Sequence, residues 1–204
     1  MHYSKRKGPF LNLKPVILAS GSPRRKSLLS SLGIKFSIQK KHAPEPAHVK
    51  GQDPVEYALG NARLKAINVP GSFVISADTI VVLGDDVIGK PKDRQDAIYM
   101  LGRLCGKRHS VITACCITSD TGRQIEFCIR SDVWLSAQPL SVITAYVETG
   151  EPMDKAGAYA IQGIGAFMVE RISGSYTNVV GLPLAELTER LVALEAIAHY
   201  EYKS

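Results

Sequence analysis

The stretch Leu18-Ala19-Ser20-Gly21-Ser22-Pro23-Arg24-Arg25 decides the fold class, because it joins a strand to a helix through a turn of small residues. The apolar run 16–19 predicts a buried strand. Ser22 is a preferred N-cap residue, and Pro23 suits the first position of a helix. A strand that passes directly into a helix is typical of an α/β protein.

The two arginines of this stretch fall in the first turn of the predicted helix. The helix dipole is positive at that end, so Arg24 and Arg25 each lose roughly 0.3–1 kcal/mol there. Backbone N–H groups, a glycine turn and two cations together favour the binding of a multiply charged anion, such as a polyphosphate. The alternative is that both arginines are solvated surface residues.

Working outward, periodicity and capping residues predict the other elements. We expect helices over 22–32, 53–68, 93–104, 141–147 and 183–198. We expect strands over 16–19, 36–39, 73–77, 81–83, 87–88, 109–118, 124–135 and 166–172, with 81–83 and 87–88 forming a hairpin. Residues 40–51 and 151–165 are predicted to be loops. This order of elements predicts an α/β fold with a mixed sheet flanked by helices.

Charge is distributed unevenly along the chain. The net charge is +6, and residues 1–50 hold 11 of the 25 basic residues but only one of the 19 acidic ones. This split favours an anionic ligand at the N-terminal region, and it disfavours a uniformly basic nucleic-acid surface. We therefore expect no stable nucleic-acid partner.

Composition also bears on location and domain organisation. A chain of 204 residues with 45% hydrophobic content predicts one globular domain, 15–204, after a basic extension, 1–14. The extension is either loose or a targeting segment.

No apolar run approaches the ~18 residues of a membrane span, so no membrane partner is expected. Four cysteines without a C-x-x-C motif are predicted to be reduced, which favours the cytoplasm: Cys105, Cys115, Cys116 and Cys128.

Charged residues outside the arginine stretch are further candidates. Asp78 ends a predicted buried strand, where a carboxylate can bind a metal ion, orient water or simply cap a turn. Lys90 follows a glycine and is a suitable point charge for phosphate. Glu45, the single acid of the first 50 residues, lies in a proline-flanked loop. The alternative for Lys90 and Glu45 is an ordinary exposed position.

The segment 151–163 combines small residues with many polar groups, as ligand-lining loops do. Its Gln162 offers both donors and an acceptor, so it can hydrogen-bond to the edge of a pyrimidine. A compact structural loop is the alternative.

Five segments in this order resemble the Maf family of nucleotide pyrophosphatases: LASGSPRR (18–25), SADTIVV (76–82), IGKP (88–91), EPMDKAGAYAIQG (151–163) and GSYTNVVGLPL (174–184). The resemblance implies an elongated mixed sheet with a nucleotide-binding cleft between two lobes, as in inosine triphosphatase-like folds. It also implies hydrolysis of nucleoside triphosphates to monophosphate and pyrophosphate with a divalent metal, and often a homodimer.

The resemblance also implies roles for individual residues. The phosphate-binding positions match Ser20, Arg24, Lys65 and Lys90. The catalytic and metal-binding carboxylates match Asp78, the first choice for activating water, and Glu45. The positions that distinguish the dTTP/UTP branch match Arg25, Thr79 and Gln162. On this basis Arg24 is expected to bind phosphate and Arg25 to face the base.

The resulting hypothesis is attack of water on the α-phosphorus of dTTP, UTP or a modified pyrimidine nucleotide, with Mg²⁺, or Mn²⁺ or Co²⁺, as cofactor. The role would be to clear unwanted nucleotides. Two alternatives remain at this point. One is a non-catalytic regulator of cell division that binds nucleotide or nucleic acid, and the other is a pyrophosphatase acting on 7-methyl-GTP or inosine-type purines.

Overall fold

The structure is a computed structural model that describes residues 8–39 and 44–200. Its helices are α1 (Pro23–Ser31), α2 (Pro54–Lys65), α3 (Arg94–Leu104), α4 (Leu140–Glu148), α5 (Tyr176–Val180) and α6 (Leu184–Ala193). Its strands are β1 (Phe10–Asn12), β2 (Val16–Leu18), β3 (Ser37–Ile38), β4 (Phe73–Leu83), β5 (Asp86–Ile88), β6 (Arg108–Thr118), β7 (Gln124–Leu135), β8 (Val169–Ser173) and β9 (Ile197–His199). Three 3₁₀ helices are η1 (Glu151–Asp154), η2 (Ala156–Ala158) and η3 (Ile164–Met168).

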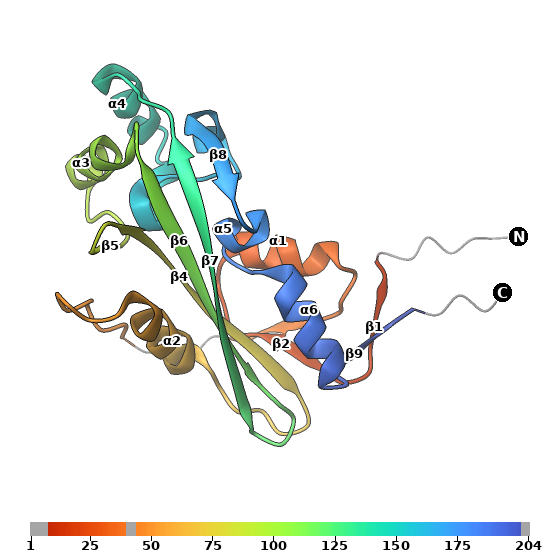
Figure 1. The fold of residues 1–204 in the computed structure, drawn as a ribbon. Helices are drawn as coiled ribbons and strands as arrows, with labels where there is room; N and C mark the ends of the chain where they lie inside the picture. Colours follow the sequence, from red (N-terminus) through yellow and green to blue (C-terminus); the bar gives the residue numbers. More distant parts are fainter. Residues whose placement is uncertain (1–7, 40–43, 201–204) are drawn as a thin grey trace, which may run out of the picture.

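Seven strands form one mixed sheet in the order β3-β2-β4-β6-β7-β8, and β5 pairs with β4 off this path. The pairings of β2 with β3 and β4 are parallel, whereas the other pairings in this sheet are antiparallel. The long strands β4, β6 and β7 run the length of the molecule (Figure 1). The predicted α/β class and mixed sheet are therefore confirmed.

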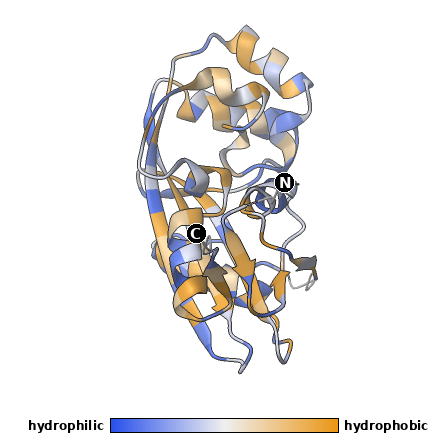
Figure 2. Ribbon diagram, turned by 90° about the vertical axis from the view of Figure 1, so that its right-hand side faces the viewer, coloured by the Kyte–Doolittle hydropathy of each residue, from blue (hydrophilic) through white to orange (hydrophobic). Residues whose placement is uncertain are grey.

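Helices cover both faces of the sheet. On one face α2 packs over β4 and β6 through a cluster that includes Ala62, Ile80 and Ile112. On the other face there are two apolar clusters, one with α1 and α6 and one with α3 and α4. Figure 1 shows these two helix groups at different ends of the long strands. Figure 2 shows hydrophobic residues along the strands of one lobe and the helices of the other.

A polar boundary separates the two apolar clusters. Along β4, Ala77 belongs to the α1–α6 cluster and Val81 to the α3–α4 cluster, so Thr79 lies between them on the same face. Along β6, Thr113 occupies the corresponding place opposite Thr79. The expected two-lobed arrangement thus arises from a break in the apolar face.

The local capping signals were read correctly from the sequence. The Ser22 side chain accepts from the Arg25 N–H at the start of α1, with Pro23 in the first turn. Asp53 and Asp93 cap α2 and α3 in the same way. The hairpin of β4 and β5 and the long strands β6 and β7 also lie where they were predicted.

Other expectations were wrong. The strand expected over 73–77 continues to Leu83, so Asp78 lies inside β4 and not at its end. The helix expected over 183–198 ends at Ala193, and the following β9 pairs with β1, which the sequence analysis placed in the extension 1–14. The helix expected to reach residue 68 ends at Lys65, and the strand expected from 166 begins at Val169.

The extension and the loop 40–51 are described only in part. Residues 1–7 and 40–43 lie outside the described residues, whereas 10–12 belong to β1. Within the described ranges, no helix is long and apolar enough to cross a membrane.

Candidate active site

A cleft of about 530 Å³ opens between the lobes. All nine residues that the sequence analysis singled out line it: Ser20, Arg24, Arg25, Glu45, Lys65, Asp78, Thr79, Lys90 and Gln162. They come from segments that are far apart in the chain. The structure therefore brings the predicted site residues together, although it leaves their individual roles untested.

The cleft forms where one edge of β4 lacks a neighbouring strand. β2 pairs with β4 only at Phe73–Ile75, and β5 pairs with it only at Val81–Leu83. Residues 76–80 between these contacts are paired on the β6 side alone. Because side chains alternate along a strand, Asp78 and Thr79 project to opposite faces there. The cleft thus reaches both faces of the sheet at this open edge.

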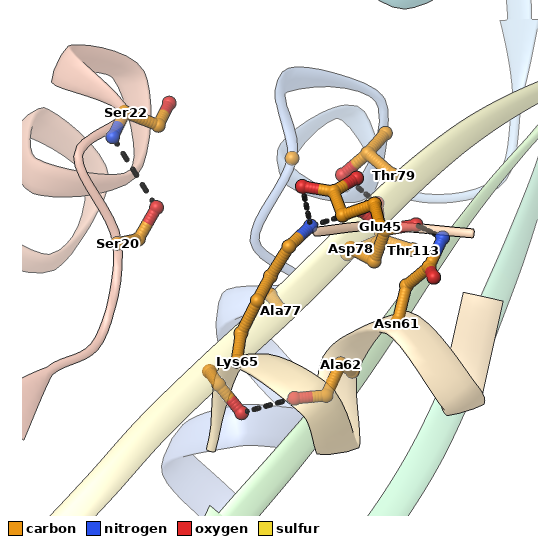
Figure 3. A network of polar contacts seen from close by, with 12 residues as sticks. Ser20, Ser22, Glu45, Asn61, Ala62, Lys65, Ala77, Asp78, Thr79 and Thr113 are labelled. Atoms are coloured by element: carbon orange, nitrogen blue, oxygen red, sulfur yellow. Dashed lines mark hydrogen bonds and ion pairs between the residues drawn. The ribbon is translucent and has the colours of Figure 1, made fainter. Parts of the chain in front are cut away.

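A lysine lies between two carboxylates on the α2 face. The Lys65 amine is 2.5 Å from Asp78 Oδ1 and 3.0 Å from Glu45 Oε1, and Figure 3 shows it between them. Asn61, one turn earlier on α2, donates from Nδ2 to Asp78 Oδ2 at 3.1 Å. Both oxygens of Asp78 are therefore occupied, and the side chain is only 9% exposed. Sequence reasoning missed Asn61, although its spacing of four from Lys65 on one helix places both on the same side.

The carboxylates of this cluster bear on metal binding. Among the described residues there is no group of three or more His, Cys, Asp or Glu side chains that could hold a metal ion. Mg²⁺ is commonly bound by one or two carboxylates together with substrate phosphates and water. Glu45 Oε2 makes no hydrogen bond or ion pair with any described residue, so Glu45 can join a metal ion that enters with a phosphate ligand. Asp78 can do so only through an oxygen that Lys65 or Asn61 also engages.

The turn before α1 presents donors to the cleft. The Ser20 hydroxyl oxygen accepts from the Ser22 N–H at 3.2 Å and from Arg25 Nη1 at 3.3 Å (the former is drawn in Figure 3). Its own proton has no acceptor within the described chain, so it is available to a ligand. Arg24 has one distant ion pair, 3.8 Å from Asp154, which is itself 66% exposed. A phosphate can therefore compete for Arg24 at little cost.

Two lysines complete this side of the cleft. Lys90 is exposed and makes no hydrogen bond or ion pair with any described residue. Lys155 donates to the Glu151 carbonyl at 2.7 Å and to Asp154 Oδ1 at 2.5 Å. Burial by itself would raise the pKa of Asp154, but the hydrogen bond from Lys155 and the charge of Arg24 lower it. The turn and these lysines form a cationic wall suited to polyphosphate.

Arg25 makes more hydrogen bonds within the protein than the sequence indicated. Its guanidinium donates to four acceptors, all neutral: Gly181 O at 2.7 Å, Ala77 O at 2.9 Å, Thr79 Oγ1 at 2.9 Å and Ser20 Oγ at 3.3 Å. Burial lowers the pKa of this guanidinium from its usual value, although the charge of Asp78 opposes the shift. Arg25 therefore joins α1, β4 and the turn after α5, and only one of its five N–H groups remains for a ligand.

Gly181 is needed where Arg25 meets the turn after α5. Its φ is +120°, and an added Cβ would lie 3.3 Å from Thr79 Oγ1. The structure also places its carbonyl against Arg25.

The loop that carries Gln162 is held from both sides. The Glu151 carboxylate accepts from the N–H groups of Ile164 and Gly165 and from the Tyr146 hydroxyl, each at 2.8 Å. The same hydroxyl accepts from the Ala160 N–H at 3.2 Å. Gln162 itself is exposed and has no partner among the described side chains and backbone groups. Glu151 and Tyr146 thus fix the backbone on each side of Gln162 and leave its amide free.

A buried pair supports the cleft wall from behind. The Tyr159 ring lines the cleft, and its hydroxyl lies 2.8 Å from His109 Nε2. His109 is 2% exposed, and burial lowers its pKa to about 4, so the ring is neutral. The sequence analysis did not identify this pair, because the two residues lie 50 positions apart.

Comparisons with known proteins cover most of the chain. Residues 15–194 match the family described as "Maf-like protein". The chain is 46% identical over 194 residues to the dTTP/UTP pyrophosphatase of Nitratidesulfovibrio vulgaris, covering 93% of this chain and 92% of the relative. It is 48% identical over 174 residues to the dTTP/UTP pyrophosphatase of Anaeromyxobacter dehalogenans, covering 84% and 89%. A nucleoside-triphosphatase / dITP/XTP pyrophosphatase structure from Mycobacterium abscessus aligns over 89% of this chain and 97% of that chain, with 14% identity and a TM-score of 0.40.

Proposed function

The chain belongs to the Maf-like family, and from that premise we propose that it hydrolyses dTTP and UTP to the nucleoside monophosphate and pyrophosphate. The observation that carries this proposal is the Lys65 amine held between Asp78 and Glu45 at the open edge of β4, beside a cationic wall. A regulator that only binds nucleotide does not require a lysine between two carboxylates.

The cationic wall would bind the triphosphate. Arg24, Lys90 and the Ser20 hydroxyl are available to phosphate oxygens, and the N-terminus of α1 adds its dipole. The ammonium of Lys65 has three N–H donors, of which one is donated to Asp78 Oδ1, and it forms an ion pair with Glu45. A remaining donor would bind the α-phosphate. Most of the catalytic effect would come from positioning and charge stabilisation.

Hydrolysis requires that water attack the α-phosphorus while the bond to the bridging oxygen of pyrophosphate breaks. Glu45, one oxygen of which makes no hydrogen bond or ion pair with any described residue, would accept the proton of that water. Asp78, with both oxygens engaged, would hold Lys65 in position. A divalent metal, which we propose is Mg²⁺ bound by Glu45 and Asp78 together with phosphate oxygens, would neutralise charge on the leaving group.

The experiment is an assay of pyrophosphate release with Mg²⁺ from dTTP, UTP, dCTP, dITP and 7-methyl-GTP at equal concentration. We expect dTTP and UTP to be hydrolysed fastest. Asp78→Asn should lose about 100-fold or more in kcat, because Lys65 then lacks its fixed partner. Asp85→Asn, in the exposed β4–β5 turn, is the matched control and should keep full activity.

Two results would overturn the proposal. Undiminished hydrolysis by Asp78→Asn would remove Asp78 from the mechanism. Faster hydrolysis of 7-methyl-GTP or dITP than of dTTP would show that the specificity lies elsewhere. Nucleotide binding and the melting temperature should be measured for each variant, so that loss of folding is separated from loss of chemistry.

We further propose a homodimer, a cytoplasmic location and a single domain, which the sequence analysis began at residue 15 and which the pairing of β1 with β9 extends to include β1. The free thiols of all four cysteines support a reducing compartment. The assembly state can be measured by light scattering during size-exclusion chromatography, and a monomer at micromolar concentration would contradict the dimer.

A further inference from the structure

The polar boundary between the two apolar clusters continues from the cleft into the interior. Thr79 Oγ1 lies 3.0 Å from Thr113 Oγ1, and Thr113 Oγ1 lies 2.9 Å from the carbonyl oxygen of Asn178. Thr113 and Asn178 are fully buried. We propose that Thr113 and Asn178 fix the hydroxyl of Thr79 as a hydrogen-bond acceptor towards the cleft, so that the site selects uracil and thymine over cytosine. This inference rests on the proposed pyrimidine specificity.

The direction of each hydrogen bond follows from counting protons. A carbonyl oxygen can only accept, so the single hydroxyl proton of Thr113 goes to Asn178 O. If Thr113 instead donated to Thr79, two unprotonated oxygens would face each other at 2.9 Å in a buried place, which is unfavourable. Thr79 must therefore donate its own proton to Thr113.

The Asn178 backbone that terminates this chain of hydrogen bonds is itself fixed. Its side-chain amide donates to Val111 O at 3.1 Å and to Ser131 Oγ at 2.9 Å. Its backbone N–H donates to Ser175 Oγ at 3.2 Å. The carbonyl thus has no freedom to turn away from Thr113.

Thr79 consequently offers the cleft only an acceptor. Its proton is used towards Thr113, and one lone pair accepts from Arg25 Nη2 at 2.9 Å. This end of the cleft therefore presents two groups to a ligand. One is the remaining lone pair of Thr79 Oγ1, and the other is the one N–H of Arg25 that has no acceptor within the described chain. Uracil and thymine carry an N3–H donor between two carbonyl acceptors, which matches an acceptor beside a donor. Cytosine carries an unprotonated N3, which would face the Thr79 lone pair.

The test uses Thr113→Val, which keeps the branched shape and removes the hydroxyl. The Thr79 proton is then released and can turn towards the cleft, so cytosine N3 gains a donor. We expect the preference for dTTP over dCTP in kcat/KM to fall about tenfold, the factor of one hydrogen bond. Thr113→Ser retains the hydroxyl and should retain the wild-type preference. Melting temperatures of both variants verify folding.

Two further measurements make the test decisive. In a Thr79→Val background, Thr113→Val should change the preference no further, because Thr113 acts through Thr79. Affinities for the α,β-imido analogues of dUTP and dCTP report base selection without hydrolysis. If those affinities shift as expected but no pyrophosphate is released, the proposed function fails and the inference stands. If the preference is the same in Thr113→Val as in wild type, the inference is wrong, whatever the activity.

Discussion

Replacing Arg25 with lysine tests whether this residue holds structural elements together or mainly binds ligand. Through four hydrogen bonds, the guanidinium connects α1 with two β4 residues, with Gly181 and with Ser20 in the turn before α1. A lysine offers its donors from a single atom, so it cannot reach acceptors that are spread around a planar fork. We expect Arg25→Lys to lose at least two of the four.

The size of the effect follows from that count. A hydrogen bond to a charged group contributes about 1.5–3 kcal/mol, and water in the cleft can replace part of the loss. We therefore expect the free energy of unfolding to fall by about 2–4 kcal/mol. For a chain of this length that corresponds to a fall in melting temperature of roughly 5–15 °C.

The neighbouring arginine provides the control. Arg24 has only the 3.8 Å contact with exposed Asp154, and such surface pairs contribute about 0–1 kcal/mol. Arg24→Lys should therefore barely change the melting temperature but should raise the KM for dTTP. Urea denaturation, thermal melting and steady-state kinetics of both variants measure these quantities. The reasoning is refuted if Arg25→Lys melts like the wild type, or if the two substitutions destabilise the protein equally.

Three further predictions concern the supporting residues. Glu151→Gln removes a charged acceptor beside Gln162, so we expect the dTTP preference over purine nucleotides to fall several-fold in a substrate panel, and an unchanged ranking would contradict this. Gly163→Ala places a Cβ 2.2 Å from Glu151 Oε1 at φ +150°, so its melting temperature should fall, and an unchanged melt would show that the loop adapts. Burial lowers the pKa of His109 from 6.5 to about 4. As pH falls from 6.5 to 4, the unfolded chain binds a proton that the folded protein does not, so stability in urea should fall by about 3 kcal/mol. That fall should be absent from His109→Gln, and an equal fall in both proteins would assign it to other groups.

Local features of the fold were predictable from sequence, because their causes lie within a few residues. Ser22, Asp53 and Asp93 each cap the helix that directly follows them. The β4–β5 hairpin likewise follows from its glycine turn. The family resemblance predicted that nine residues share one cleft. The family match confirms the family, and all nine residues line the cleft.

What the sequence did not predict depends on distant partners. The surroundings of Asp78 depend on where β2 and β5 stop, and neither end is visible in the sequence around Asp78. The helix dipole indicates an unfavourable energy for Arg25 at the start of α1. It does not indicate which distant groups, such as the Gly181 carbonyl, accept its hydrogen bonds. The short strands β1 and β9 pair across nearly the whole chain, and three residues are too few to show a periodicity.

The open edge of β4 also bears on how this protein can change in evolution. Asp78 and Thr79 are consecutive, yet Asp78 contacts Lys65, whereas the hydroxyl of Thr79 is the acceptor that we propose faces the base. A single-residue insertion or deletion between Phe73 and Asp78 would move each side chain to the opposite face of the sheet and exchange the two chemistries. A substitution in this part of β4 changes one side chain at a time. A change in length would disrupt the proposed hydrolysis and the proposed selection of the base together. We therefore expect length variation among functional descendants of this chain to fall in its turns and never in this part of β4.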